Sequence, residues 1–204
     1  MSGTGNGQSM NLGMGTISVY IRYLVRYGCN CGEADSILVT IERKAFYFLG
    51  NPELGWACIE PTIKKIRGKN STIKTQVYSE LTKGQKALLM FRVLYDHARN
   101  SEEEFYSWIN ILLNEPHSWS EIKVGLRYFQ DDSMLQFLDE TESFLNKKNE
   151  LLNNEHSQNR GISSLIYPNG EDFYSVFCKI TQETINLIGT YIRNNPEEFV
   201  RFID

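Results

Sequence analysis

The stretch ALLMFRVLYDHARNSEEE, residues 87–104, decides the fold class of this chain. Ala87, Phe91, Leu94 and Ala98 recur at intervals of three and four residues, which places them on one side of a helix. The apolar pattern stops near Asn100. The stretch therefore predicts a core-facing helix that ends just before a polar, acidic segment.

Signals for further helices follow this stretch along the chain. Ser101 and Glu104 have the spacing of a capping box, in which the serine hydroxyl and the glutamate carboxylate each accept from an amide at a helix start. Ser118 and Glu121 repeat that spacing. Two helices are therefore predicted, one opening at each serine.

The C-terminal part continues in the same way. Asp131 or Asp132 is predicted to start another helix, and apolar residues at helical spacing run from Phe173 to Tyr191. Asn195 begins Asn-Pro-Glu-Glu, which is typical of a helix opening because proline and acids suit the first turn. The expected fold class is all-α, an antiparallel multi-helix assembly with short loops.

The N-terminal part has a less decisive pattern. Residues 16–27 alternate as a strand would and also fit a helical stripe, so the region 16–41 allows a short β-hairpin. Apolar residues from Ile37 to Phe48 lie at helical spacing. The helix signal that follows, residues 53–66, is interrupted by Pro61.

The sequence predicts that the chain is divided into a tail and two helical parts. Residues 1–15 are glycine-rich and predict a flexible tail. Residues 16–70 are expected to form an N-terminal helical subdomain, and residues 71–204 a C-terminal helical domain. The basic stretch 64–74 is the candidate linker between them.

Composition excludes several classes of protein. The 204 residues, 41% hydrophobic and 23% charged, suit a globular chain rather than a disordered or fibrous one. No apolar run reaches the roughly 18 residues of a membrane-spanning helix. Four cysteines do not make a disulfide framework, so we expect reduced thiols and a cytoplasmic protein.

Charge is distributed unevenly along the chain. The net charge is −4, but residues 1–79 hold nine basic against five acidic residues, and residues 80–204 hold twelve against twenty. The segment from Glu102 to Glu142 contains ten acids and only Lys123 and Arg127 as bases. A surface of this sign repels phosphates and attracts basic proteins.

The residues that carry most enzyme and metal chemistry are sparse. The three histidines have no second ligand at metal-binding spacing, and Cys29-x-Cys31 lacks the spacing of a zinc site. We therefore expect no metal, no cofactor and no catalysis. Two alternatives stay open: a small hydrolase that uses a carboxylate or His97 between helices, and nucleic-acid binding by residues 64–74.

The C-terminal part also resembles a known family. The residues that carry the resemblance are Glu80-Leu81-Thr82-Lys83-Gly84-Gln85-Lys86-Ala87-Leu88, the segment Phe105 to Asn110, Glu171-Asp172-Phe173-Tyr174 and the ending Tyr191 to Phe199. Over about residues 78–203 the chain is similar to the bacterial DNA-mimic protein family. In that family an Asn-Gly-Gly-Phe core precedes the middle helices, whereas here Glu102-Glu103-Glu104-Phe105 stands in its place.

The resemblance implies a protein that dimerises and offers acidic side chains in place of DNA phosphates. Together with the acidic segment, it predicts a non-enzymatic regulator that binds a basic or DNA-binding protein, without contacting nucleic acid or a membrane itself. An immunity or inhibitor protein that neutralises a toxin or defence enzyme is the alternative. The expected partner-binding residues are Glu102, Glu103, Glu104, Asp131, Asp132, Asp139, Glu140 and Glu142.

Overall fold

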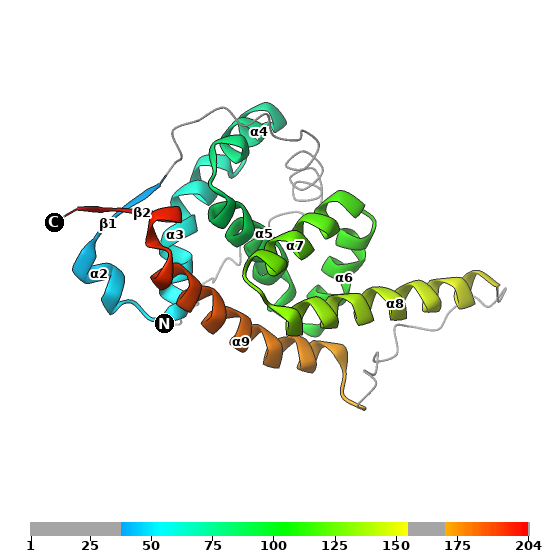
Figure 1. Ribbon diagram of the computed structural model, residues 1–204. Coiled ribbons are helices and arrows are strands. Elements are labelled where there is room, and N and C mark those ends of the chain that lie inside the picture. The colour runs from blue at the N-terminus through cyan, green and yellow to red at the C-terminus, as the bar shows by residue number, and fades with distance from the viewer. Residues whose placement is uncertain (1–37, 155–169, 204) are drawn as a thin grey trace, which may run out of the picture.

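The computed structural model describes residues 38–154 and 170–203, without the side chains of residues 148–154. The tail predicted over 1–15 and the ambiguous segment 16–27 lie outside the described residues. The elements are β1 (Val39–Glu42), α2 (Arg43–Phe48), α3 (Asn51–Ile66), α4 (Ser71–Glu80), α5 (Lys83–Ala98), α6 (Glu102–Leu113), α7 (Pro116–Tyr128), α8 (Asp132–Asn154), α9 (Phe173–Asn194), the 3-10 turn η1 (Pro196–Glu198) and β2 (Val200–Ile203). The all-α class is confirmed, with one small strand region (Figure 1).

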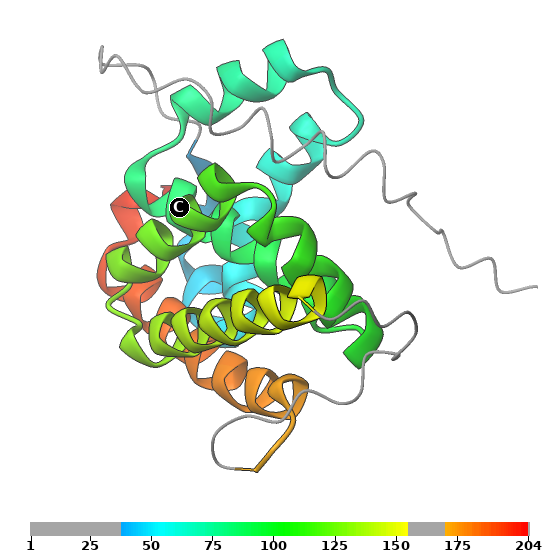
Figure 2. The same ribbon diagram turned by 90° about the vertical axis from the view of Figure 1, so that its right-hand side faces the viewer.

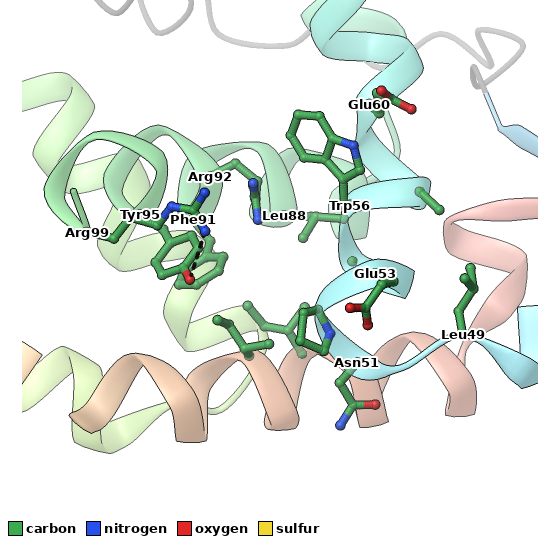
Figure 3. Close-up of a pocket in the computed structure, with 15 residues that line it drawn as sticks. Leu49, Asn51, Glu53, Trp56, Glu60, Leu88, Phe91, Arg92, Tyr95 and Arg99 are labelled. Carbon is green, nitrogen blue, oxygen red and sulfur yellow. Dashed lines mark hydrogen bonds between the residues drawn. The ribbon is translucent and has the colours of Figure 1, made fainter. Parts of the chain in front are cut away.

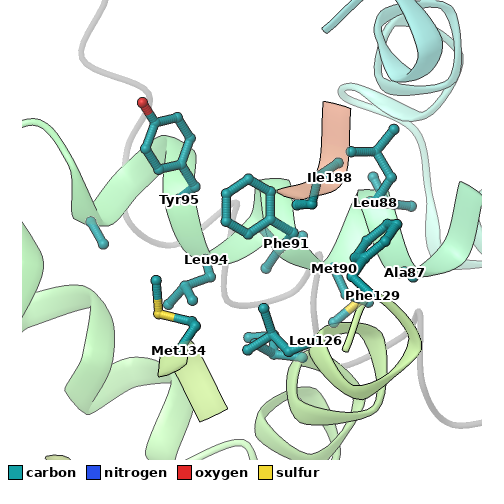
Figure 4. Close-up of a cluster of buried hydrophobic side chains, with 14 of the residues drawn as sticks. Ala87, Leu88, Met90, Phe91, Leu94, Tyr95, Leu126, Phe129, Met134 and Ile188 are labelled. Atoms are coloured by element: carbon teal, nitrogen blue, oxygen red, sulfur yellow. The ribbon is translucent and has the colours of Figure 1, made fainter. Parts of the chain in front are cut away.

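Helix α5 lies at the centre of the fold, and the core-facing side predicted from the opening stretch of sequence is confirmed. It packs against α3, α6 and α7, while α8 and α9 run side by side in opposite directions across one side of the molecule (Figures 1 and 2). Ala87, Phe91, Leu94 and Ala98 are all buried. Figure 4 shows that the side chains of this helix meet those of α7, α8 and α9 in one apolar cluster.

The helix starts predicted at Ser101 and at Asp131 or Asp132 are confirmed, and the one predicted at Ser118 is wrong. The Ser101 hydroxyl accepts from the Glu104 amide at 3.1 Å, but the Glu104 carboxylate accepts from Asn100 and not from the Ser101 amide. Asp131 caps α8, since its carboxylate accepts from a backbone amide. Ser118 does not open a helix, because Pro116, whose fixed φ suits a first turn, begins α7 two residues earlier. Ser118 is consequently buried inside α7.

The strand region joins the two ends of the described chain. Residues 39–42, predicted as part of a helix between Ile37 and Phe48, form β1, which pairs in parallel with β2. Val39 lies opposite Val200 and Glu42 opposite Ile203. This strand therefore pairs with the far end of the chain, and the rest of the region that allows a β-hairpin, residues 16–37, lies outside the described residues.

The predicted linker is mostly helical. Helix α3 continues through Pro61 to Ile66, and α4 begins at Ser71 with the Asn70 side chain as its cap. Only residues 67–70 connect the two helices. Buried residues of α3 and of the helices after residue 71 belong to the same hydrophobic cluster, so the boundary predicted at residue 70 does not separate two cores.

The C-terminal segment returns to the start of α5. The signal at Asn195 produces only the short turn η1, after which Phe199 is fully buried. The Glu198 carboxylate accepts from the Gly84 amide at 3.1 Å and from the Tyr128 hydroxyl. An acid at a helix N-terminus stabilises its free amides, so Glu198 ties α5, α7 and the chain end together.

Glycine sets the distance between α5 and α7. A Cβ atom at Gly125 would lie 3.0 Å from the Ala87 carbonyl oxygen and 3.1 Å from its Cα. These neighbours are backbone atoms, so they cannot move aside without shifting a helix. At Gly55, inside α3, an added Cβ would meet nothing within 4 Å.

This contrast makes a paired prediction about stability. Gly125→Leu should lower the free energy of unfolding by about 2 kcal/mol or more, because it forces α5 and α7 apart. Gly55→Leu should leave it unchanged or raise it by up to about 1 kcal/mol, because leucine favours a helix interior over glycine. Urea unfolding followed by circular dichroism measures both. Equal losses in the two variants would contradict the packing described above.

Candidate functional site

The first turn of α6 carries three adjacent exposed acids, Glu102, Glu103 and Glu104. The Glu104 carboxylate accepts from the Asn100 side chain at 2.7 Å, a neutral partner that leaves its charge in place. Among the described residues, no lysine or arginine forms an ion pair with these three. The helix dipole favours acids at this position, which explains why they are tolerated side by side.

The negative charges of Glu102 and Glu104 act on Tyr174, at the start of α9. The Tyr174 hydroxyl donates to the Arg99 carbonyl at 3.0 Å, which brings α9 close to the connection between α5 and α6. Burial raises the pKa of Tyr174, and a hydrogen bond with Cys178 and the negative charges of Glu102 and Glu104 raise it further. The phenol therefore stays neutral, and α6 and α9 pack together here, with the ring centroids of Phe105 and Tyr174 5.9 Å apart.

Asp131 and Asp132 differ although they are neighbours. Asp131 exposes only 4% of its surface, because its carboxylate accepts from the Met134 amide at 3.0 Å as the cap of α8. Asp132 is exposed in the first turn of the same helix. Asp131 is thus a structural residue, a correction to the predicted partner-binding set, because a buried cap cannot reach a partner.

Asp139 and Glu142 are brought together on one lysine. Lys123 of α7 forms ion pairs with Asp139 at 2.6 Å and with Glu142 at 2.5 Å. The Trp119 indole also donates to Glu142, at 2.8 Å. Burial opposes the charge of Lys123, but its hydrogen bonds to the two carboxylates outweigh that effect and raise its pKa. These two acids are therefore partly neutralised, which the sequence alone did not indicate.

Five of the eight predicted residues are neither buried nor ion-paired within the described part of the chain. Glu140 is half-buried and accepts from the neutral Gln136 side chain at 2.8 Å. We call the remaining acids the acidic set; its members are Glu102, Glu103, Glu104, Asp132 and Glu140. They lie on α6 and α8. These two helices meet at Phe105 and Phe137, whose ring centroids are 6.3 Å apart.

The histidine and cysteine candidates do not form a reactive site. His97 packs its ring 4.3 Å from that of Trp108, and burial lowers the pKa of His97, so the imidazole favours its neutral form. Burial also raises the pKa of Cys58 to about 12, which keeps its thiol protonated and unreactive. Within residues 38–154 and 170–203, no group of three histidine, cysteine or acidic residues could hold a metal ion.

The structure contains a cleft that the sequence did not predict. It has a volume of about 570 Å³ and lies between α3, α5 and α9 (Figure 3). Its floor is apolar and closed, since Leu88, Phe91 and Ile188 expose no more than 3% of their surfaces. The open space lies above this floor, bordered by Trp56 of α3 and by side chains of α5.

Two arginines line the cleft: Arg92 of α5 and Arg99, which caps the C-terminus of that helix. Arg92 packs its guanidinium 4.8 Å from the Trp56 ring and pairs with Asp96 through Nε, at 3.1 Å, and through Nη2. Arg99 lies over the Tyr95 ring at 5.0 Å and donates to its hydroxyl at 3.3 Å. Burial lowers the pKa of Arg92 and the Asp96 carboxylate opposes this, so the pair holds a charged guanidinium in a half-buried place.

The two acids that line the cleft, Glu53 and Glu60, each have a contact within their own helix. Glu60 forms an ion pair with Lys64 at 3.0 Å. A Cβ at Gly50 would lie 2.5 Å from a carboxylate oxygen of Glu53, so Glu53 is folded back onto the N-terminus of its own helix. Acids are stabilised at that end of a helix. Of the two acids that line the cleft, Glu60 is therefore ion-paired and Glu53 keeps its charge, while Arg99 is the arginine without an ion pair among the described residues.

A weak signal for this cleft existed in the sequence. Arg92, Asp96 and Arg99 are spaced four and three residues apart, which places them on one face of the predicted helix, and Tyr95 lies beside them. The partner surface, Trp56 and Gly55, comes from a helix whose position relative to α5 the sequence does not specify. The face could be predicted, but the cleft could not.

Comparisons with protein-family models, with characterised proteins and with solved structures give no match for this chain. The resemblance to the DNA-mimic family therefore stays a prediction. None of the helices in the described ranges is both long and apolar enough to cross a membrane.

The contacts of Glu142 predict a pH-dependent contribution to stability. Burial opposes the charged form, but the hydrogen bonds from Lys123 and Trp119 prevail and lower the pKa of Glu142 below 4.5. A carboxyl whose pKa is lower in the folded than in the unfolded state stabilises the fold at pH values above its unfolded-state pKa. This stabilisation is lost as the pH falls through its folded-state pKa. At pH 7, Glu142→Gln should therefore lower the free energy of unfolding by about 0.5–1 kcal/mol, the range for a partly exposed pair.

Urea unfolding at pH 7 and in acid measures this effect, and the difference from the unchanged protein should shrink in acid. Glu140→Gln is the matched control, because its described partner is neutral, and it should change stability by less than about 0.5 kcal/mol. A loss for Glu142→Gln that is the same at both pH values would rule out the charge as its cause.

Proposed function

We propose that this protein is a non-enzymatic regulator that binds a basic protein partner through the acidic set. The observation that carries the proposal is the exposed, unpaired run of Glu102, Glu103 and Glu104 on a capped helix start. Under this proposal the protein acts in the cytoplasm, and a DNA-binding protein is the partner class, as the resemblance implies.

The physical basis is competition for cationic side chains. A DNA-binding protein gains affinity from lysines and arginines that displace counterions from phosphates. Fixed carboxylates can occupy the same groups, provided that they are held on a rigid surface and are not neutralised internally. The Ser101 cap and the packing of Phe105, which is fully buried, hold the three glutamates of α6 in place.

The partial neutralisation at Lys123 narrows the proposed contact surface. Asp139 and Glu142 attract a basic partner less strongly, because both form ion pairs with Lys123. The proposal therefore relies on α6 and the beginning of α8 rather than on the whole segment from Glu102 to Glu142. An inhibitor that neutralises a toxin or defence enzyme would use the same surface, with a basic enzyme as its partner.

The hydrolase alternative has less support. The cleft supplies a concave space, but its described lining contains no histidine, cysteine or serine, and His97 packs elsewhere. Its two carboxylates are Glu60, which is ion-paired with Lys64, and Glu53, which lies against the N-terminus of its own helix. A hydrolase needs a nucleophile or a base within hydrogen-bond reach of its substrate. We therefore do not assign hydrolysis to this cleft.

Charge reversal tests the proposal. Glu102→Lys with Glu103→Lys should reduce capture of the basic partner at low salt by about tenfold or more, since each lost attraction and new repulsion is worth about 0.5–1 kcal/mol. Partners are captured from cell extract and quantified by mass spectrometry, with far-ultraviolet circular dichroism as the check on folding. High salt should weaken capture by the unchanged protein.

The matched control is Glu183→Lys with Glu197→Lys, which reverses two exposed acids outside the acidic set. This variant has the same net charge and should retain capture. Duplex DNA separates the two partner classes, because it should displace a DNA-binding partner and leave a toxin or other enzyme bound. Equal capture by both double variants would mean that the acidic set does not recognise the partner.

A further inference from the structure

We propose that the cleft between α3, α5 and α9 is a binding site for a small organic acid, a carboxylate attached to a flat apolar body. This site is separate from the acidic set and its ligand has the opposite charge to the partner proposed above. The inference rests on four features of the cleft: its size, its floor, the unused donors of its arginines and the space beside Gly55.

The size and the lining suit a small molecule. Ligand sites in proteins commonly enclose about 300–1,000 Å³ with mainly apolar walls and a few polar groups, and this cleft has about 570 Å³. Its floor of Leu88, Phe91 and Ile188 is closely packed, so a ligand would lie across it rather than penetrate the core. A flat apolar body fits this space beside the Trp56 ring (Figure 3).

The guanidinium of Arg92 is oriented before any ligand arrives. One face packs on Trp56, and the Nε and Nη2 edge is paired with Asp96. Its Nη1 group has no hydrogen-bond acceptor among the described residues. Arginine binds carboxylates through paired N–H groups, and a guanidinium already fixed by stacking loses little freedom when it does so.

Arg99 supplies a second positive charge at the same opening. Both arginines lie over the Tyr95 ring, at 5.3 Å for Arg92 and 5.0 Å for Arg99. Asp96 compensates one of the two charges, and Glu53 and Glu60 are held by a helix N-terminus and by Lys64. With Lys64 counted, the formal charges of these groups sum to zero, so the attraction for an anion comes from the position of Arg99, which forms no ion pair among the described residues.

Gly55 gives an independent indication that space is kept open. Gly84, Gly125 and Gly189 lie in helices where an added Cβ would approach another atom within 3.0 Å. Gly55 alone among the described helical glycines has open space at that position, and it lines the cleft. Glycine costs about 1 kcal/mol in a helix interior, and packing does not require it here.

Phenylpropionate is a suitable probe, because it joins a carboxylate to one aromatic ring. Titration calorimetry with the full chain should detect its binding, with phenylpropionamide at least tenfold weaker because it lacks the charge. Arg99→Gln should weaken phenylpropionate binding about tenfold. Arg127→Gln, which removes an exposed positive charge of α7 outside the cleft, should leave it unchanged.

Gly55→Leu tests the location of the site. This variant is expected to fold normally, as argued above, and its side chain would enter the cleft and abolish binding. Three results would overturn the proposal: no binding of phenylpropionate, equal affinity for the acid and the amide, or undiminished binding by folded Gly55→Leu. Because none of these measurements involves the acidic set, their failure would leave the proposed protein-binding function intact.

Discussion

The close contact between α5 and α7 is the constraint on which the rest of the structure depends. Gly125 allows the α7 backbone to approach Ala87, and this distance positions Leu126 and Phe129 against the buried face of α5. The other helices pack around that pair, because α5 is apolar on most of its surface. The Glu198 carboxylate then links the start of α5 to the end of α7, because it accepts from the Gly84 amide and from the Tyr128 hydroxyl.

This arrangement gives α5 two different surroundings. Its buried side organises the core, while Arg92 and Arg99 reach the cleft beside α3. The acids of α6 begin immediately after α5 ends, so one central helix supports both proposed sites. Their opposite charges are compatible with separate ligands, because the arginines are held by Asp96 and Tyr95 instead of pairing with the glutamates of α6.

Burial and ion pairing inside the molecule reduce the number of acids between Glu102 and Glu142 that are available to a partner. Ten acids between Glu102 and Glu142 indicate a strongly negative surface when they are counted along the chain. Burial of Asp131 as a cap and the ion pairs at Lys123 remove three of the eight predicted residues from that surface. The five that remain without burial or an ion pair are three residues of α6 and two of α8.

Local sequence determined the helical class, the buried side of α5 and the caps at Ser101 and Asp131, because periodic apolar residues and capping side chains act within one or two turns. Tertiary structure decided the parallel pairing of Val39 with Val200, the burial of Ser118, the compensation at Lys123 and the cleft beside Trp56. Each of these features joins segments whose relative positions are set by how whole helices pack. The pattern of residues along the chain does not specify how far apart, or in what orientation, two distant segments lie.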